Sequence, residues 1–185
     1  AGGGARLPAY IGILNALSQL QIEVRHLVGV SGGSIVASLR AAGYSLDAIR
    51  DVAMETNFAQ FLGQNFLSLL RTGGLSNGDS FERWIDEKLD GRCFGDLENA
   101  LTVIATDVRS GEADVFSSTR TPDVRVSRAV RYSMSVPLLF SFLHDGERVM
   151  TDGSILAEET VRSDWAGDGT PEMMLKQRGH GGLET

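Results

Sequence analysis

The chain has 185 residues, of which 42% are hydrophobic and 22% are charged, a balance that predicts one globular domain with a buried core. Its net charge of −7 argues against binding to nucleic acid, because the phosphate backbone repels an acidic surface. Cys93 is the only cysteine, which excludes an internal disulfide and a multi-cysteine zinc site. No apolar run is long enough to span a bilayer, and no signal-peptide pattern is present. We therefore expect a soluble protein, cytoplasmic or peripheral at membranes, and secretion stays open if the natural start lies upstream.

The first third of the chain predicts a helix, a strand and two further helices. Apolar residues recur at helical spacing over residues 10–20, and the apolar run over residues 22–30 is typical of a strand. A helix rich in small residues follows this strand and is expected to stop at Gly43. Ser45 is then expected to cap the next helix.

The segment of residues 58–70 carries a broad apolar face with two open interpretations. Its large side chains are Phe58, Phe61, Leu62, Phe66, Leu69 and Leu70. They offer more apolar surface than one small helix usually buries, so they either pack in the core or form a lid or interfacial face for lipid. A further helix up to Leu89 is expected to be capped by Asp79 or Ser80.

The second half of the chain predicts mostly strands. Residues 101–105 are typical of a buried strand, and a partner strand is expected around Val115 and Phe116. A short helix should begin at Ser127. Asp145-Gly146 is a strong hairpin signal between residues 140–143 and 148–151. Strands that alternate with helices indicate the α/β class.

Gly29-Val30-Ser31-Gly32-Gly33 matches the pattern G-x-S-x-G where a predicted strand meets a predicted helix. A serine in this position lies on a sharp turn, and Gly29 and Gly33 on either side let the backbone turn and a substrate approach. The first N–H groups of the following helix would face negative charge that develops near Ser31. The pattern predicts a nucleophile elbow.

Two other segments have residues suited to anion binding or catalysis. Gly2-Gly3-Gly4-Ala5-Arg6 precedes a predicted helix, where several backbone N–H groups can bind an anion, either a phosphate or the oxyanion of an acyl-transfer intermediate. Leu7 occupies the last position of G-x-G-x-x-G, and no Walker lysine follows, so nucleotide binding is disfavoured. Asp152-Gly153-Ser154 follows a strand-like run, and it is either an ordinary turn or a carboxylate placed in a cleft.

A serine nucleophile is most often paired with a histidine, and the chain has three histidines. His26 lies five residues before Ser31 on the predicted strand, and His144 belongs to the predicted hairpin. His180 lies in the glycine-rich tail, although the order Ser31, Asp152, His180 follows that of the α/β-hydrolases. We expect structural or surface roles for all three.

Together these segments resemble the patatin-like phospholipase family. That family has a glycine-rich oxyanion loop, a G-x-S-x-G turn and a D-G-G or D-G-A motif in this order. Residues 2–6, 29–33 and 152–154 follow that order here. Residues 105–111 add to the likeness, as do residues 128–137, which are similar to the family's helix that ends in a Ser-x-x-x-Pro stretch.

The resemblance implies a three-layer α/β/α sandwich with a mostly parallel central sheet, a patatin-like catalytic domain over residues 1–163. Residues 164–185 would form an irregular C-terminal tail. The glycine loop begins at residue 2, without the strand that should lead into it, so we expect an incomplete sheet and a fragment of a longer chain.

The resemblance also implies the chemistry: a serine lipid acyl hydrolase of the phospholipase A type with a Ser–Asp dyad. Ser31 would attack the ester carbonyl and Asp152 would accept its proton. The oxyanion would be held by backbone N–H groups of the loop, with Arg6 supporting it; the loop residues are Gly2, Gly3 and Gly4. No metal or organic cofactor is implied, and the partner would be a lipid substrate at a membrane surface.

Three departures from the family pattern keep other interpretations open. Leu7 replaces the usual glycine after Arg6, and Ser154 replaces a glycine or alanine after Asp-Gly. Residues 155–159 lack the asparagine and proline that the family usually has there. One alternative is an α/β-hydrolase or acyltransferase that uses a Ser–His system. The other is a catalytically inactive lipid-binding module that retains the fold.

Overall fold

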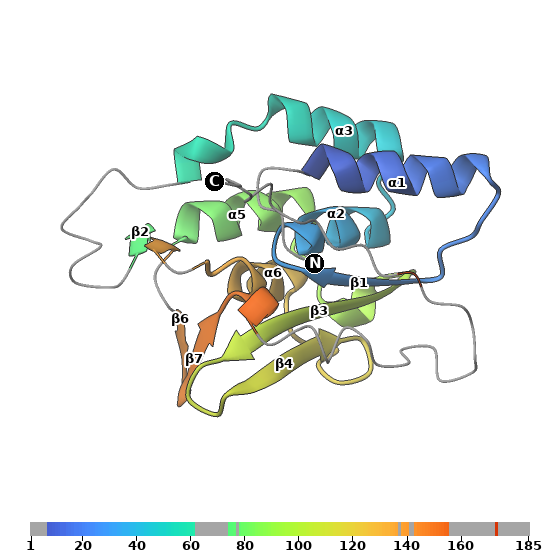
Figure 1. Ribbon diagram of the computed structural model, residues 1–185. Helices are drawn as coiled ribbons and strands as arrows, with labels where there is room; N and C mark the ends of the chain where they lie inside the picture. Colours follow the sequence, from blue (N-terminus) through green and yellow to red (C-terminus); the bar gives the residue numbers. More distant parts are fainter. Residues whose placement is uncertain are drawn as a thin grey trace, which may run out of the picture.

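The computed structural model describes residues 7–61, 74–76, 78–136, 138–140, 143–155 and residue 173. Helices dominate the first half of the described chain and strands the second half (Figure 1). The α-helices are α1 (Leu7–Gln19), α2 (Gly32–Ala41), α3 (Leu46–Glu55), α5 (Asp79–Lys88) and α6 (Val126–Ser133). The strands are β1 (His26–Val30), β2 (Gly74–Ser76), β3 (Ala100–Asp107), β4 (Glu112–Ser117), β5 (Leu138–Phe140), β6 (Leu143–Asp145) and β7 (Arg148–Thr151). Short 3-10 turns are η1 (Phe58–Phe61), η2 (Phe94–Asp96) and η3 (Gly153–Ile155).

Strand β3 is the centre of the larger sheet. It runs parallel to β1, with His26 opposite Ala100 and Val30 opposite Ile104. It runs antiparallel to β4 along most of its length and to β7 at its last two residues, and β6 pairs with β7 at the edge. The sheet is therefore mixed in strand direction, while the separate pair of β2 and β5 is parallel. The parallel β1–β3 pair brings the carboxyl ends of both strands to one edge of the sheet.

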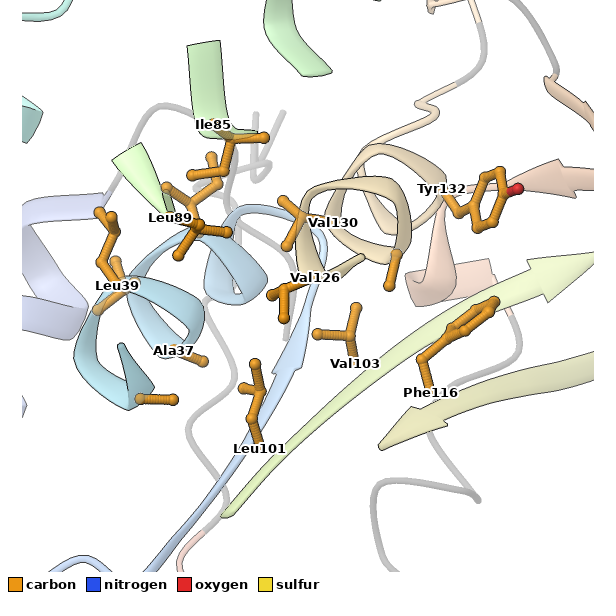
Figure 2. Packing of buried hydrophobic residues seen from close by; sticks show 14 of the residues in the cluster. Ala37, Leu39, Ile85, Leu89, Leu101, Val103, Phe116, Val126, Val130 and Tyr132 are labelled. Carbon is orange, nitrogen blue, oxygen red and sulfur yellow. The ribbon is translucent and has the colours of Figure 1, made fainter. Parts of the chain in front are cut away.

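The expected α/β class is confirmed, and the described α-helices lie on one face of the sheet (Figure 1). Helices α2 and α6 pack directly on β1 and β3, and α1, α3 and α5 pack against them. Figure 2 shows Leu101 and Val103 of β3 pointing toward Val126 and Val130 of α6. On the opposite face, Ile104 belongs to a smaller buried cluster with Val30 and Val115.

Local signals explain several element boundaries. The Ser45 hydroxyl accepts a hydrogen bond of 3.1 Å from the N–H of Ala48, so Ser45 caps α3 as expected. The hairpin of β6 and β7 turns at Gly146, whose φ of 60° is costly for other residues. Phe140, however, belongs to β5 and pairs with β2, so it is not part of this hairpin.

Two boundaries differ from the sequence expectation. Strand β1 begins at His26 and not at Ile22, because its partner β3 begins at Ala100, directly opposite His26. Ile22 is 49% exposed in the connection before the strand. Helix α5 is preceded by Gly78 in the left-handed conformation (φ 75°), so neither Asp79 nor Ser80 is its N-cap.

The aromatic side chains after α3 belong to the core. Phe61 is 5% exposed, and its ring lies 5.6 Å from that of Phe81 and 5.4 Å from that of Trp84. Phe58 is partly buried and meets Trp84 edge to face at 5.6 Å. Leu62, Phe66, Leu69 and Leu70 lie outside the described residues. For Phe61, the structure therefore favours core packing over a lid.

The expected tail of residues 164–185 lies outside the described residues, apart from residue 173. Within the described ranges, no helix has the length and apolar character needed to cross a bilayer.

Candidate active site

Ser31 lies between the last residue of β1 and the first residue of α2. Its backbone adopts φ 52° and ψ −133°, a conformation that costs a non-glycine residue on the order of 1–3 kcal/mol and is typical of nucleophile elbows. Although Ser31 occupies the N-cap position of α2, its side chain does not cap the helix. The residue is only 4% exposed. Its hydroxyl is therefore held at a buried turn and directed away from its own helix.

The Ser31 hydroxyl donates a 2.6 Å hydrogen bond to Oδ2 of Asp152. Asp152 directly follows β7 and is 3% exposed. Its Oδ1 accepts a 2.7 Å hydrogen bond from the N–H of Ser154, and its own N–H donates to the carbonyl of Ser135 at 3.0 Å. These contacts fix the carboxylate, and Oδ2 faces the hydroxyl whose proton it could accept.

Two glycines at the site are required by close packing. A Cβ atom on Gly29 would lie 2.6 Å from the Cα of Ser34 in α2. A Cβ atom on Gly153 would overlap the carbonyl oxygen of Ile104 in β3. At Gly33, by contrast, the nearest atom to a Cβ would be Cζ of Tyr10 at 3.9 Å, an ordinary contact. Within the G-x-S-x-G pattern, packing thus demands glycine at the first position and not at the last.

The end of α6 contacts Ser31 from a distant part of the chain. The Ser31 N–H donates to Oγ of Ser133 at 2.8 Å, and the Ser31 hydroxyl lies 3.9 Å from Sδ of Met134. Neither residue was assigned a role from the sequence. The Ser-x-x-x-Pro stretch at the end of the predicted helix indicates that this segment resembles the family. It does not indicate that the segment contacts Ser31.

The dipole of one helix is directed at Ser31, and a buried arginine holds the turn that follows α6. The N-terminus of α2 begins at Gly32, so the positive end of its dipole faces Ser31. Arg131 of α6 is fully buried, and its Nη1 donates to Oγ of Ser135 at 2.6 Å. Burial lowers the pKa of Arg131 to about 10, so its guanidinium still carries its charge at neutral pH.

The histidines are placed elsewhere or outside the described residues. His26 begins β1, roughly 16 Å before Ser31 at the usual rise per strand residue, and its Nε2 contacts Oγ1 of Thr102 at 2.9 Å. His144 is exposed on β6, opposite Val149. His180 lies outside the described residues, as does the expected oxyanion loop of Gly2, Gly3, Gly4 and Arg6.

The chain is similar to several known proteins. Protein YqhO of Bacillus subtilis (strain 168) is 29% identical to this chain, in an alignment that covers 85% of this chain and 62% of that protein. VipD from Legionella pneumophila superposes with a TM-score of 0.65 at 18% identity, over 84% of this chain and 45% of VipD. ExoU from the type III secretion system of Pseudomonas aeruginosa, solved in complex with SpcU, gives a TM-score of 0.58 at 21% identity, over 74% of this chain and 37% of ExoU.

The two structural likenesses concern the fold, and the chain spans less than two thirds of the length of each of these proteins. A family model described as patatin-like phospholipase matches residues 1–163, which include both Ser31 and Asp152. The chain therefore belongs to the patatin-like phospholipase family.

Proposed function

We propose that this protein is a serine lipid acyl hydrolase that cleaves fatty acyl esters of phospholipids or related lipids. The observation that carries the proposal is the 2.6 Å hydrogen bond from the Ser31 hydroxyl to Asp152 at a buried, strained turn. Family membership supports the same chemistry and names the substrate class.

The reaction would proceed through an acyl-serine intermediate. Oγ of Ser31 attacks the ester carbonyl while its proton passes to Oδ2 of Asp152. The tetrahedral oxyanion would be stabilised by N–H groups at the start of α2 and by those of Gly2, Gly3 and Gly4. The C–O bond of the ester then breaks, and Asp152 returns the proton to the leaving alkoxide. In the second half, Asp152 takes a proton from water, which attacks the acyl-serine, and Ser31 regains its proton as the fatty acid leaves.

The geometry favours this dyad over a Ser–His system. A histidine base would have to lie within hydrogen-bond reach of Ser31. Of the two histidines that the structure describes, His26 is at the opposite end of β1 and His144 is on an exposed hairpin. The carboxylate of Asp152, in contrast, already accepts a hydrogen bond from the Ser31 hydroxyl. The inactive lipid-binding module is disfavoured by the same contact, because binding alone requires no strained serine paired with a buried carboxylate.

A fluorophosphonate probe tests the proposal directly, since it labels only an activated serine. The wild-type protein should gain one adduct on Ser31, and Ser31→Ala should gain none. In parallel, vesicles of defined phospholipids should release free fatty acids, measured by mass spectrometry, with wild type and not with Ser31→Ala. Labelling at another residue, or a Ser31→Ala protein that retains hydrolysis, would overturn the proposal.

A further inference from the structure

One turn at the end of α6 contacts both residues of the proposed dyad. Oγ of Ser133 accepts the N–H of Ser31 at 2.8 Å, and the carbonyl of Ser135 accepts the N–H of Asp152 at 3.0 Å. Ser31 and Asp152 are 121 residues apart, whereas the two serines that hold their backbones are separated by one residue. The turn therefore sets the position of each dyad residue relative to the other.

The hydroxyl of Ser133 is both a hydrogen-bond donor and a hydrogen-bond acceptor. It donates to the carbonyl of Ile104 in β3 at 2.6 Å and accepts from the N–H of Ser31. Ser133 has no exposed surface, so water cannot replace either bond without rearrangement. Its removal would leave a buried N–H and a buried carbonyl without these partners, which is costly for backbone groups.

The hydrogen bond of the Ser31 N–H helps to hold Ser31 in its strained backbone conformation. A φ of 52° persists at a serine only when its surroundings hold it there. The bond to Ser133 fixes the direction of the Ser31 N–H, and with it the direction in which the Ser31 side chain leaves the backbone. If the turn relaxed, the hydroxyl would move away from Oδ2 of Asp152.

The other end of the turn is anchored to buried groups. The carbonyl of Ser135 also accepts a 3.0 Å hydrogen bond from Oγ1 of Thr151, the residue before Asp152. Oγ of Ser135 accepts from Nη1 of Arg131 at 2.6 Å and donates to the Arg131 carbonyl at 2.9 Å. The Arg131 guanidinium in turn lies 5.1 Å from the centre of the Phe140 ring. The turn is thus a rigid support and not a loose connection.

We propose that Ser133 is a positioning residue of this enzyme: it acts through Ser31, by holding the elbow so that the hydroxyl faces Asp152. The inference rests on the proposed function, because it assumes that Ser31 and Asp152 perform the chemistry. It gives a structural role to Ser133, the first residue of the Ser-x-x-x-Pro stretch. The sequence pattern alone does not indicate that role.

The test compares Ser133→Ala with Ser38→Ala on a soluble short-chain ester. Ser38 is the matched control, since it is equally buried and its hydroxyl donates to a backbone carbonyl, that of Ile35, within α2. Ser133→Ala should lower kcat by about 10- to 100-fold with KM changed by less than about threefold, because small displacements of reacting groups have effects of this size. The rate of fluorophosphonate labelling should fall in parallel. Ser38→Ala should retain kcat within about twofold of wild type, a range well below the misplacement effect.

The outcomes separate this inference from the proposed function. If Ser133→Ala and Ser38→Ala have equal kcat while Ser31→Ala is inactive, Ser133 is only a core residue and the inference fails. If Ser31→Ala itself retains activity, the proposed function fails. Folding is checked by near-ultraviolet circular dichroism. Should Ser133→Ala not fold, the pair Ser133→Cys and Ser38→Cys replaces it, because a thiol keeps the shape but accepts hydrogen bonds weakly; an unchanged kcat in Ser133→Cys would then overturn the inference.

Discussion

Gly29 at the end of β1 lies so close to Ser34 in the first turn of α2 that a Cβ atom would be 2.6 Å from the Ser34 Cα. It would also lie 3.1 Å from the Cβ of Ala37, so both neighbours belong to the helix that follows the nucleophile. The direction in which α2 leaves the strand, and hence the position of Ser31, depends on the absence of a side chain at this point.

We expect Gly29→Ala to lower the free energy of unfolding by about 1–3 kcal/mol, the usual range for overpacking, and to lower kcat by about tenfold or more. Gly33→Ala is the matched control, since its Cβ would meet only Tyr10 at 3.9 Å. It should be stable and retain kcat within a few fold. Urea denaturation and ester hydrolysis measure the two effects. Equal damage from both substitutions would contradict the packing argument.

Asp152→Asn should abolish hydrolysis while preserving the fold. The amide oxygen can still accept the N–H of Ser154, but the amide nitrogen cannot accept the proton of Ser31. We expect kcat to fall by roughly 10³-fold or more, as for other catalytic groups. Thermal unfolding should be close to that of wild type. A folded Asp152→Asn protein that keeps more than a few per cent of its activity would show that another group is the base.

Substitution of the histidines should leave most of the activity in place. His26→Ala removes the contact with Thr102 and should cost some stability, whereas His144→Ala changes an exposed hairpin. His180→Ala tests the order Ser31, Asp152, His180 directly. Loss of a catalytic histidine typically costs about as much as loss of the serine, so the two mechanisms differ by several orders of magnitude in kcat. If His180→Ala is as inactive as Ser31→Ala, the α/β-hydrolase mechanism replaces the dyad.

Phe61→Ala should destabilise the protein by about 3–5 kcal/mol, as for other buried phenylalanines. The ring is 5% exposed and packs against Phe81 and Trp84. Met54→Ala, at a position that is 74% exposed, is the control and should have little effect on stability. Guanidinium denaturation and sedimentation with vesicles distinguish the roles. A stable Phe61→Ala protein that no longer binds vesicles would favour an interfacial role.

The ionisation of Tyr132 makes the free energy of unfolding depend on pH in the alkaline range. Burial, together with the nearby carboxylate of Asp145, raises the pKa of Tyr132 from 10.0 to about 12. The folded state therefore retains this proton at a pH where the unfolded state loses it. The resulting stability is fully present below pH 10 and is lost as pH rises toward 12.

The free energy of unfolding of wild type should thus fall more steeply between pH 9 and pH 11.5 than that of Tyr132→Phe, by on the order of 1–2 kcal/mol. Tyr44→Phe is the control, because it also removes a tyrosine hydroxyl that is hydrogen-bonded, here to the carbonyl of Lys88 at 2.8 Å. Urea denaturation at several pH values measures the slopes. Parallel curves for wild type and Tyr132→Phe would contradict this assignment.

The sequence alone determined features that depend on neighbours along the chain. The cap at Ser45 and the hairpin turn at Gly146 follow from hydrogen bonds and backbone preferences within a few residues. The elbow at Ser31 was predicted for the same reason, since G-x-S-x-G describes one local strand-to-helix turn. The α/β class followed from the order of apolar periods.

Only the tertiary structure decided which distant groups meet. The start of β1 at His26 depends on where β3 begins, and the glycine before α5 is required because a side chain at Gly78 would overlap Arg131. The contact of Ser31 with Asp152, and the bond from its N–H to Ser133, arise because α6 packs on the face of β3 and β7 pairs with the last two residues of β3. Such contacts join residues more than 100 positions apart, and no local pattern encodes that proximity; it is set by the burial of apolar faces across the whole core.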